Sequence, residues 1–284
     1  MTEHADLINV AGWAVHVPGL SAAELPGSPA EPACPPDRAL EVLGRKGLLG
    51  KDPSTRMALC AVHRALGLPP GRLAEPLPGA AGTAVVVASN LGNVETVCEV
   101  LTDVRERSVS AVSPLDAPNA SSNVIASSIA IRYGFTGPNL MVCSGATAGL
   151  DAVRLAQLLL RSGRAGRAVV VGVEPADPVA RRLAELRPDP PGELLAGAGC
   201  LLLGRPGAWP WTTGLHLGPV RRADRAVPAD IRPGELYGAA GVVRLAVTAA
   251  GLAAGESAHV GCGDPEDGWA SVRLTRAAAE GAAA

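Results

Sequence analysis

The residues with the clearest chemical potential lie in the run Met141–Ala152. An apolar strand end passes into a turn of small residues, and a helix begins near Gly149. The first N–H groups of a helix are free and its N-terminus carries a partial positive charge, so a cysteine at this turn would ionise readily. The residue at the turn is Ala146. The run therefore predicts the geometry of a nucleophile turn without the nucleophile.

The same run resembles a segment of the ketosynthases of the thiolase fold, and within them the chain-length factors of type II polyketide synthases. Those factors carry Gln-Ala-Gly-Gly-Leu-Asp-Ala where active ketosynthases have cysteine. Residues 146–152, Ala-Thr-Ala-Gly-Leu-Asp-Ala, match from Gly149 onward. Residues 129–138 and 168–174 are also similar to the family, at matching spacing.

Alternating helix and strand patterns independently predict an α/β fold. We expect helices over residues 52–66, 93–104, 121–133, 149–161 and 238–254, and strands over residues 7–15, 83–88, 139–143, 168–173, 198–203 and 268–274. Short, continuously apolar strands between helices are typical of a sheet that is covered on both faces.

The resemblance implies a more specific architecture, a thiolase-like fold with αβαβα layers. It would consist of two pseudo-duplicated halves, residues 1–175 and 176–284, the second of them shortened. The tetrapeptide Val-Arg-Leu-Ala occurs at 153–156 and again at 243–246, each time in a helix that follows a glycine-bearing turn. This echo fits a duplication.

The resemblance also implies which positions should be catalytic, and each is degenerate. The family uses one cysteine, two histidines and a glycine-rich oxyanion loop for decarboxylative condensation. Ala146 replaces the cysteine, the loop of the first histidine is missing, and Glu235 replaces the second histidine in the run 234–241. Trp269 lies where the oxyanion loop is expected. We therefore predict a pseudo-active site without catalytic residues, and we interpret the acidic run 264–267 as a solvated loop.

Two other functions stay open. The chain could be an autonomous acyltransferase or hydrolase with a rewired site that uses Cys143 or Glu235. It could also be a scaffold that binds acyl carrier protein. Against the first, Cys143 belongs to an apolar strand, where we expect a buried and unactivated thiol.

The resemblance implies an interface. The family dimerises by pairing the strand before the nucleophile with its twin, and that strand is here Leu140, Met141, Val142 and Cys143. We predict a heterodimer with a catalytic ketosynthase, which would receive acyl carrier protein. The phosphopantetheine arm of the carrier would contact the partner, so this chain would need no cofactor of its own.

By the same resemblance, Ala120, Ser121, Ser122 and Val124 would line the tunnel for the growing acyl chain. The aromatic polyketide factors carry bulky side chains there, whereas these residues are small. This predicts a wider channel, suited to a linear polyene chain. The alternative is a polar loop that caps the following helix.

Composition excludes several classes of function. A net charge of −2 and few aromatic residues argue against nucleic acid as a partner. Six scattered cysteines without a short metal-binding spacing predict neither a metal site nor disulfides, and so reduced, buried thiols. No apolar run reaches the ~18 residues of a membrane span, and Met1–Asp6 does not look like a signal peptide, which predicts a soluble cytoplasmic protein.

Overall fold

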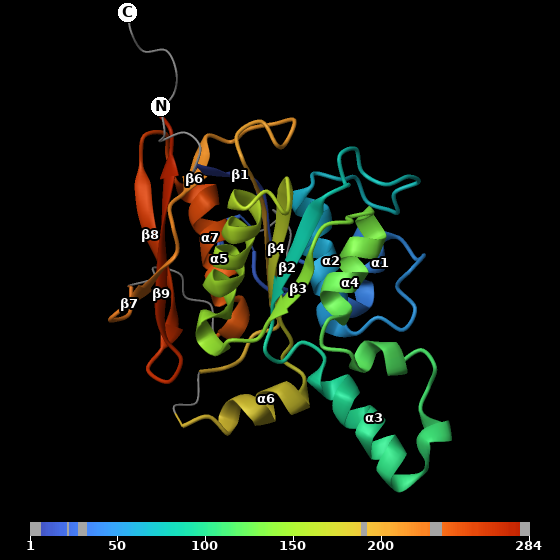
Figure 1. Cartoon of the computed structure of the whole chain (residues 1–284). Helices are drawn as coiled ribbons and strands as arrows, with labels where there is room; N and C mark the ends of the chain where they lie inside the picture. The colour runs from blue at the N-terminus through green and yellow to red at the C-terminus, as the bar shows by residue number, and fades with distance from the viewer. Residues whose placement is uncertain (1–6, 22, 28–32, 189–191, 228–234, 279–284) are drawn as a thin grey trace, which may run out of the picture.

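The computed structural model describes residues 7–21, 23–27, 33–188, 192–227 and 235–278 (Figure 1). The segment Met1–Asp6 and Gly234, both considered above, lie outside the described residues. None of the described helices is long and apolar enough to cross a membrane.

The strands form one mixed sheet, in the order β3-β2-β4-β5-β1-β6-β9-β7, and β8 pairs with β9 outside this path. The strands are β1 (Ile8–His16), β2 (Thr83–Ala88), β3 (Asn139–Val142), β4 (Arg167–Glu174), β5 (Gly197–Gly204), β6 (Leu215–Leu217), β7 (Arg221–Ala223), β8 (Ser257–Asp264) and β9 (Gly268–Arg276). β2 is parallel to both β3 and β4, whereas β5 is antiparallel to β4 and β1.

The helices follow the predicted pattern closely. They are α1 (Leu40–Leu43), α2 (Pro53–Ala65), α3 (Val94–Glu106), α4 (Val124–Tyr133), α5 (Ala148–Arg161), α6 (Pro178–Glu185) and α7 (Ala240–Gly251). The start of α2 shows why: the Asp52 side chain accepts a hydrogen bond from Thr55 N at 2.8 Å, and Pro53 takes the first helical position.

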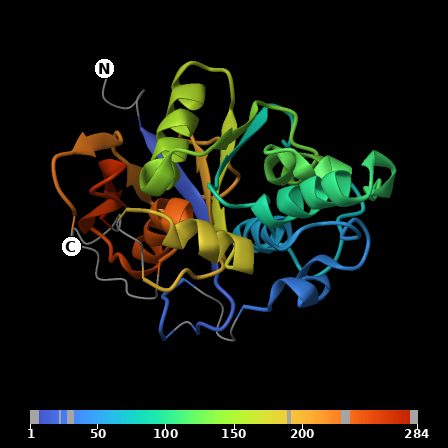
Figure 2. The same cartoon turned by 90° about the horizontal axis from the view of Figure 1, so that it is seen from below.

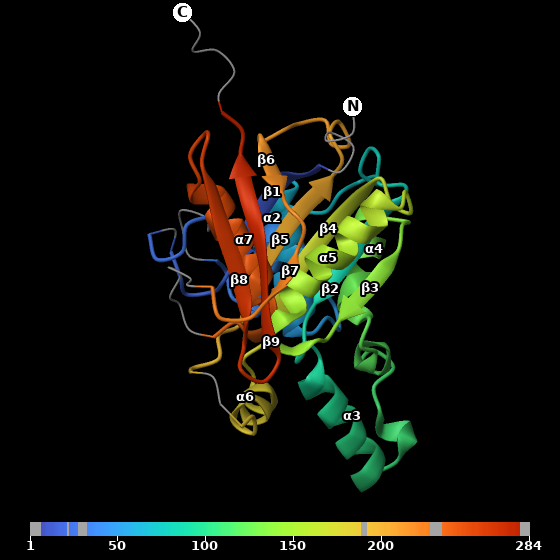
Figure 3. The ribbon, with the colours of Figure 1, turned by 60° about the vertical axis from the view of Figure 1, so that its left-hand side comes forward.

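Figures 1 and 3 show that α5 and α7 lie between two parts of the sheet, β1–β5 on one side and β8–β9 on the other. Helices α2 and α4 cover the opposite face of β1–β5. This layering confirms the predicted thiolase-like α/β fold. Within the described residues no helix covers the outer face of β8 and β9, where His259 and Arg273 are exposed.

The two hydrophobic cores explain the continuously apolar strands. In β2, Ala84 and Val86 belong to the core that contains α5 and α7, whereas Val85 and Val87 belong to the core that contains α2 and α4. Successive side chains of a strand point to opposite faces, so a strand that is buried on both faces must be apolar throughout.

α5 and α7 contact each other through glycines, and the two Val-Arg-Leu-Ala segments lie one in each helix. A Cβ on Gly149 would lie 2.9 Å from Gly241 N, and a Cβ on Gly241 would lie 2.9 Å from Leu150 N. Only glycine at both positions allows the backbones to approach so closely.

Several elements differ from the sequence prediction. The helix expected from Ser121 begins at Val124, because Ser121 to Asn123 form a turn. The elements that were not predicted are α1, α6, β6, β7 and β8. β8 is rich in small and polar residues, and it becomes a strand through its pairing with β9. The division at residue 175 stays a prediction, but β5 follows that point and pairs with β4 and β1 of the first half.

One region projects from the layered body. α3 has no buried residue, and it extends downward in Figures 1 and 3 together with the segment that leads to α4. Seen from below, α3 lies near α6, against which it packs (Figure 2). Leu101, Val109 and Leu115 of this projecting region are 61%, 75% and 53% exposed. We call residues 93–123 the arm.

Candidate functional site

The predicted nucleophile turn is a 3-10 turn, Gly145–Thr147, between β3 and α5. Ala146 is buried, and Gly145 has a φ of 68°. Asn90, which follows β2, binds this turn twice: its Nδ2 donates to Gly145 O at 2.9 Å, and its Oδ1 accepts from Gly145 N at 3.1 Å. The turn is therefore fixed by an amide side chain that the sequence analysis did not identify.

The space at the turn is filled by a carboxylate. Ala146 N donates a hydrogen bond to Asp267 Oδ2 at 2.7 Å, and a Cβ on Gly145 would overlap the same carboxyl group. Asp267 belongs to the hairpin turn between β8 and β9, which lies beside this point. Our interpretation of residues 264–267 as a solvated loop was wrong, because Asp267 reaches inward to the helix N-terminus, where a negative charge is favoured.

Arg187 forms ion pairs with the acidic hairpin. Its Nη2 lies 3.1 Å from Asp267 Oδ2 and also pairs with Asp264, and its guanidinium stacks on the Tyr237 ring at 4.2 Å. The Arg187 side chain is only 13% exposed. Burial alone would lower the pKa of Arg187, but the bond to Asp264 and the surrounding negative charges raise it overall. The site therefore contains an internal ion pair where a substrate would need space.

A second turn, Tyr237–Ala239, opens α7 in the same way. Glu235, which occupies the predicted histidine position, uses Oε1 to accept a hydrogen bond from Tyr237 N at 2.6 Å. Tyr237 has a φ of 38°, and among the described residues it is the only non-glycine residue with a positive φ. The structure thus gives Glu235 a local role, in which it caps a strained turn.

Glu174, at the end of β4, is a buried acid that entered the sequence analysis only as the last residue of the family-like run 168–174. It accepts hydrogen bonds from Asn90 N at 2.8 Å, Leu91 N at 3.0 Å and Ser89 Oγ at 3.2 Å. Burial raises the pKa of Glu174 to about 7, although these donors act in the opposite direction. A carboxyl group after an apolar strand was the available signal, but its burial depends on the tertiary structure.

Cys143 does not lie where we expected. It follows β3 rather than ending it, and its side chain is exposed instead of buried. The Sγ atom donates to Ser89 O at 3.0 Å. Partial burial and the nearby Glu174 charge raise the pKa of Cys143, so the expectation that the thiol is not activated agrees with its surroundings.

Trp269 lies in β9, opposite Ala223 of β7 and Gly263 of β8. It is half-buried and belongs to the hairpin that carries Asp267. The residue that reaches Ala146 is therefore two positions before the one that the resemblance indicated.

The residues proposed for the tunnel lie at the end of the arm and at the start of α4. Ala120 ends a 3-10 turn, Ser121 and Ser122 are exposed, and Val124 is buried in the first turn of α4. Asn93 Nδ2 donates to Ser121 O at 3.0 Å, which ties this connection to the start of α3. The lining of a tunnel by these residues stays a prediction.

The strand proposed for the interface lies at the edge of the sheet. Within the described residues β3 pairs only with β2, and Leu140, Met141 and Val142 are all half-buried. Pro138 O and Val142 O accept hydrogen bonds from β2. Because the backbone groups of a strand alternate in direction, the N–H and C=O of Met141 point away from β2, toward the free edge.

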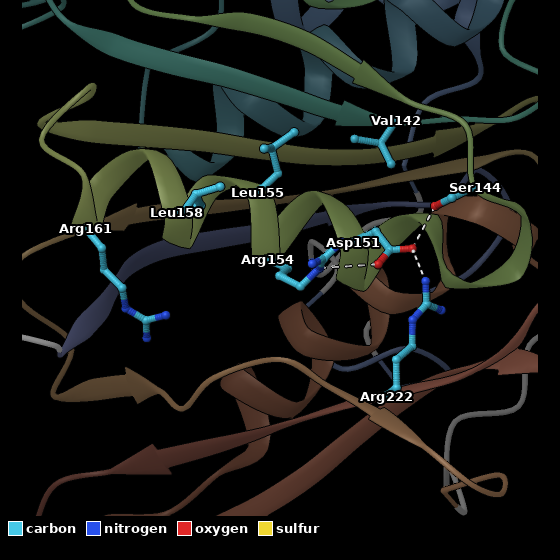
Figure 4. A pocket seen from close by; sticks show the side chains of 8 residues that line it. All are labelled: Val142, Ser144, Asp151, Arg154, Leu155, Leu158, Arg161 and Arg222. Atoms are coloured by element: carbon cyan, nitrogen blue, oxygen red, sulfur yellow. Dashed lines mark hydrogen bonds and ion pairs between the residues drawn. The ribbon is translucent and has the colours of Figure 1, made fainter.

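A groove of about 440 Å³ runs beside this edge, along α5 (Figure 4). Leu155 and Leu158 of α5 line it together with Val142. At one end, Asp151 accepts hydrogen bonds from Ser144 Oγ and Thr147 Oγ1, each at 2.8 Å, and its carboxylate pairs with the groove arginines. These arginines are Arg154 and Arg222, at 3.7 and 3.5 Å. The groove thus joins an apolar wall to a charged end.

The family follows from comparison with known sequences. The family described as "Beta-ketoacyl synthase, N-terminal domain" matches residues 37–184, just over half of the chain. The chain therefore belongs to the beta-ketoacyl synthase family, as its motifs indicated. No curated protein matches it in sequence.

Three solved structures share the fold. A chain of "The ishigamide ketosynthase/chain length factor" is 20% identical, with a TM-score of 0.71, over 96% of this chain and 100% of that one. A chain from "AntDE:AntF (apo): type II PKS acyl-carrier protein in complex with its ketosynthase bound to the hexaketide" is 14% identical, with a TM-score of 0.68, over 96% and 99%. A chain from "Ketosynthase (ApeO) in Complex with its Chain Length Factor (ApeC) from Xenorhabdus doucetiae" is 15% identical, with a TM-score of 0.56, over 95% and 99%.

Proposed function

We propose that this chain is the non-catalytic subunit of a ketosynthase pair, a chain-length factor that binds an active β-ketoacyl-acyl-carrier-protein synthase. The observation that carries the proposal is the hydrogen bond from Ala146 N to the Asp267 carboxylate. In a condensing enzyme, backbone N–H groups at such a turn stabilise the oxyanion of the tetrahedral intermediate. Here an internal anion already uses that donor.

Three features of the site agree in opposing catalysis. Ala146 offers no thiol, the Asp267 carboxylate would repel a developing oxyanion, and Glu235 is a further anion where the family has a histidine. Decarboxylation of a malonyl group produces negative charge, which these carboxylates would destabilise. Chemistry in a complex would therefore belong to the partner.

The partner surface would be the β3 edge. An exposed edge strand with apolar side chains is a template for pairing with another strand. Leu140 and Val142 pack against the core on one face of the sheet, and Met141 packs against the core on the other face. A strand added at this edge would therefore extend both cores. The groove leucines Leu155 and Leu158, the latter 61% exposed, extend the apolar surface beside it. Two of the similar structures are described as a ketosynthase together with a chain length factor.

Proline substitutions give a sharp test of this edge. Met141→Pro removes an outward N–H without removing a bond to β2, and edge strands tolerate proline in that orientation. We expect the variant to fold but to fail to form a 1:1 complex with a co-expressed ketosynthase, by size exclusion with light scattering. Leu140→Pro is the matched control, because it removes a bond to β2 and should destabilise the monomer itself.

Two results would contradict the interface. One is a wild-type chain that stays monomeric with every co-expressed ketosynthase. The other is a Met141→Pro variant that still forms the complex. Leu186→Asp, a charge at an exposed apolar residue after α6, should leave the complex intact.

Within this function we further propose that Ala120, Ser121, Ser122 and Val124 limit the acyl chain, and that their small size suits a long linear product such as a polyene. The exposure of Ser121 and Ser122 in the isolated chain is compatible with a wall that a partner completes. The carrier protein would deliver its phosphopantetheine arm to the partner.

Bulk at this position should shorten the product. Ser121→Phe or Ala120→Phe would fill space that only long chains reach, and overpacking costs about 1–3 kcal/mol, up to about a hundredfold in rate. Mass spectrometry of carrier-bound intermediates from the reconstituted pair should show shorter chains with early extensions preserved. Leu49→Phe, at an exposed residue outside this run, is the control. An unchanged length distribution in intact complexes would place the tunnel elsewhere.

The rewired acyltransferase is the competing function, and Cys143 is the exposed cysteine beside the turn. The raised pKa of Cys143 opposes this role. Transfer of a radiolabelled acyl group to the isolated chain, abolished by Cys143→Ala, would favour the acyltransferase over the proposal.

A further inference from the structure

Three side chains that are far apart in the sequence meet beside the sheet. His16 ends β1, Cys34 follows in the next loop, and Cys60 lies in α2. One ring nitrogen of His16 and the two Sγ atoms all lie within 4.8 Å of one another. His16 and Cys34 are 18 positions apart, so the cluster has no short sequence motif. This is why a search for metal-binding spacings did not find it.

The surroundings of His16 favour a bound cation. The ring is fully buried, and its Nε2 lies 3.0 Å from Cys34 O, whereas its Nδ1 has no hydrogen-bond partner among the described residues. If Nε2–H donates to the carbonyl, the lone pair is on Nδ1. Metal-binding histidines are commonly held in this way, with one nitrogen on a backbone carbonyl and the other on the metal. A buried nitrogen without a partner otherwise opposes folding.

We propose that His16, Cys34 and Cys60 bind a thiophilic divalent cation of the zinc class, with a fourth position open to water. Two thiolates and one imidazole are a ligand set that zinc prefers over magnesium or calcium. The two thiolate charges would balance a divalent ion, so the buried site would be neutral when occupied.

Contacts within the cluster shift the pKa values of the two thiols in opposite directions. The thiol of Cys60 lowers the pKa of Cys34 through a hydrogen bond, and His16 and Arg64 lower it further. The same bond and burial raise the pKa of Cys60. The two thiols thus contact each other and His16, as ligands of one ion would.

An occupied site would link three elements. It would join the end of β1 to α2 and hold the loop that carries Cys34 against the second core, to which Cys60 and Cys34 already contribute. Because the unfolded chain lacks this arrangement, a bound metal should stabilise the fold. This role is independent of the proposed function and of the β3 edge.

Cobalt is a direct probe of the site. The chain, purified with a reductant and freed of metal, should bind about one equivalent of Co²⁺ with a thiolate-to-cobalt charge-transfer absorption, and Zn²⁺ should remove that absorption. Cys34→Ser should abolish the signal, and so should His16→Ala. Zn²⁺ should raise the melting temperature of the wild-type chain and not that of Cys34→Ser.

Cys200→Ser and Cys98→Ser are the matched controls, one for a buried and one for an exposed free cysteine outside the cluster. Both should retain the cobalt signal. Since Cys34 is only half-buried, its variant should fold, and circular dichroism would verify this. A wild-type chain without a cobalt signal, or a full signal in Cys34→Ser, would overturn the proposal. So would a Cys34–Cys60 disulfide in the chain before any reductant is added, found by mass spectrometry of its linked peptides.

Discussion

The turns that open α5 and α7 are built alike, but their carboxylates lie in different surroundings. In each turn, a carboxylate from a distant part of the sequence fills the place where a Cβ on a glycine would lie. Asp267 fills it at Gly145, and Glu174 Oε1 would be 2.6 Å from a Cβ on Gly238. Each helix start is thus packed against a carboxylate from far away in the sequence.

The two carboxylates differ in whether a cation pairs with them. Asp267 is partly exposed and has Arg187 at 3.1 Å, so its charge is both paired and solvated. Glu174 is fully buried, and it accepts hydrogen bonds from the neutral groups of Ser89, Asn90 and Leu91. Burial therefore raises the pKa of Glu174 to about 7. A carboxylate can fill such a turn as a permanent charge when a cation accompanies it, whereas an uncompensated one remains a titrating group.

The largest effect on stability should come from the close contact between α5 and α7 at Gly149 and Gly241, which holds both turns in place. We call this contact the crossing. In Gly241→Ala, the new Cβ would lie 2.9 Å from Leu150 N, and a backbone atom cannot move aside easily. We expect a loss of about 3 kcal/mol in the free energy of unfolding, measured by urea denaturation. Gly251→Ala, at the end of the same helix with open space around it, should be neutral or slightly stabilising. Equal effects of the two substitutions would mean that the crossing is not tight.

Glu174 should make stability depend on pH. Its folded-state pKa is raised from 4.5 to about 7, so its contribution is fully present below about pH 4.5 and is lost as the pH rises through about 7. We expect the free energy of unfolding to fall by about 2 kcal/mol between about pH 5 and about pH 8, and Glu174→Gln to remove most of this fall. If wild type and Glu174→Gln have parallel profiles, Glu174 is ionised throughout.

These two turns also show which features of the fold and the site could be predicted from the sequence. The α/β alternation, α5 with its preceding turn and the degenerate Ala146 were all predictable, because helix caps, apolar runs and motif spacing are local properties. The role of Asp267 was not, since an acidic hairpin turn looks the same whether it faces water or a helix 121 positions away. The burial of Glu174 and the His16 cluster likewise depend on tertiary packing.

Arg187 should contribute less than the helix crossing. Arg187→Leu would leave Asp264 and Asp267 close together without a cation, although both remain about a quarter exposed. Partial solvation limits the expected loss to about 1–2 kcal/mol, and the loss should shrink at high salt, which screens the charges. Arg182→Leu is the matched control, because its ion pair with Glu185 is exposed and should contribute under about 0.5 kcal/mol. A loss that does not depend on salt would show that packing on Tyr237, and not charge, is what Arg187 supplies.

The smallest expected effect is on the reactivity of a thiol placed in the turn before α5. Ala146→Cys would place a thiol at the N-terminus of α5, which by itself lowers a thiol pKa, but beside the Asp267 carboxylate, which raises it. We expect slow alkylation by iodoacetamide in a Cys34→Ser/Cys98→Ser/Cys143→Ser background, which removes the accessible cysteines of the described residues. Alkylation should become about tenfold faster once Asp267→Asn is added, one pKa unit being a tenfold change in thiolate at fixed pH. Glu266→Gln, which removes a charge near Arg187 but not the bond to Ala146 N, should change the rate little. Neither cysteine variant should catalyse condensation, because Glu235 still stands in place of the histidine. Alkylation at the same rate with and without Asp267→Asn would show that the Asp267 carboxylate fills the turn without affecting the pKa of a thiol there. The difference between Asp267 and Glu174 would then be one of packing alone.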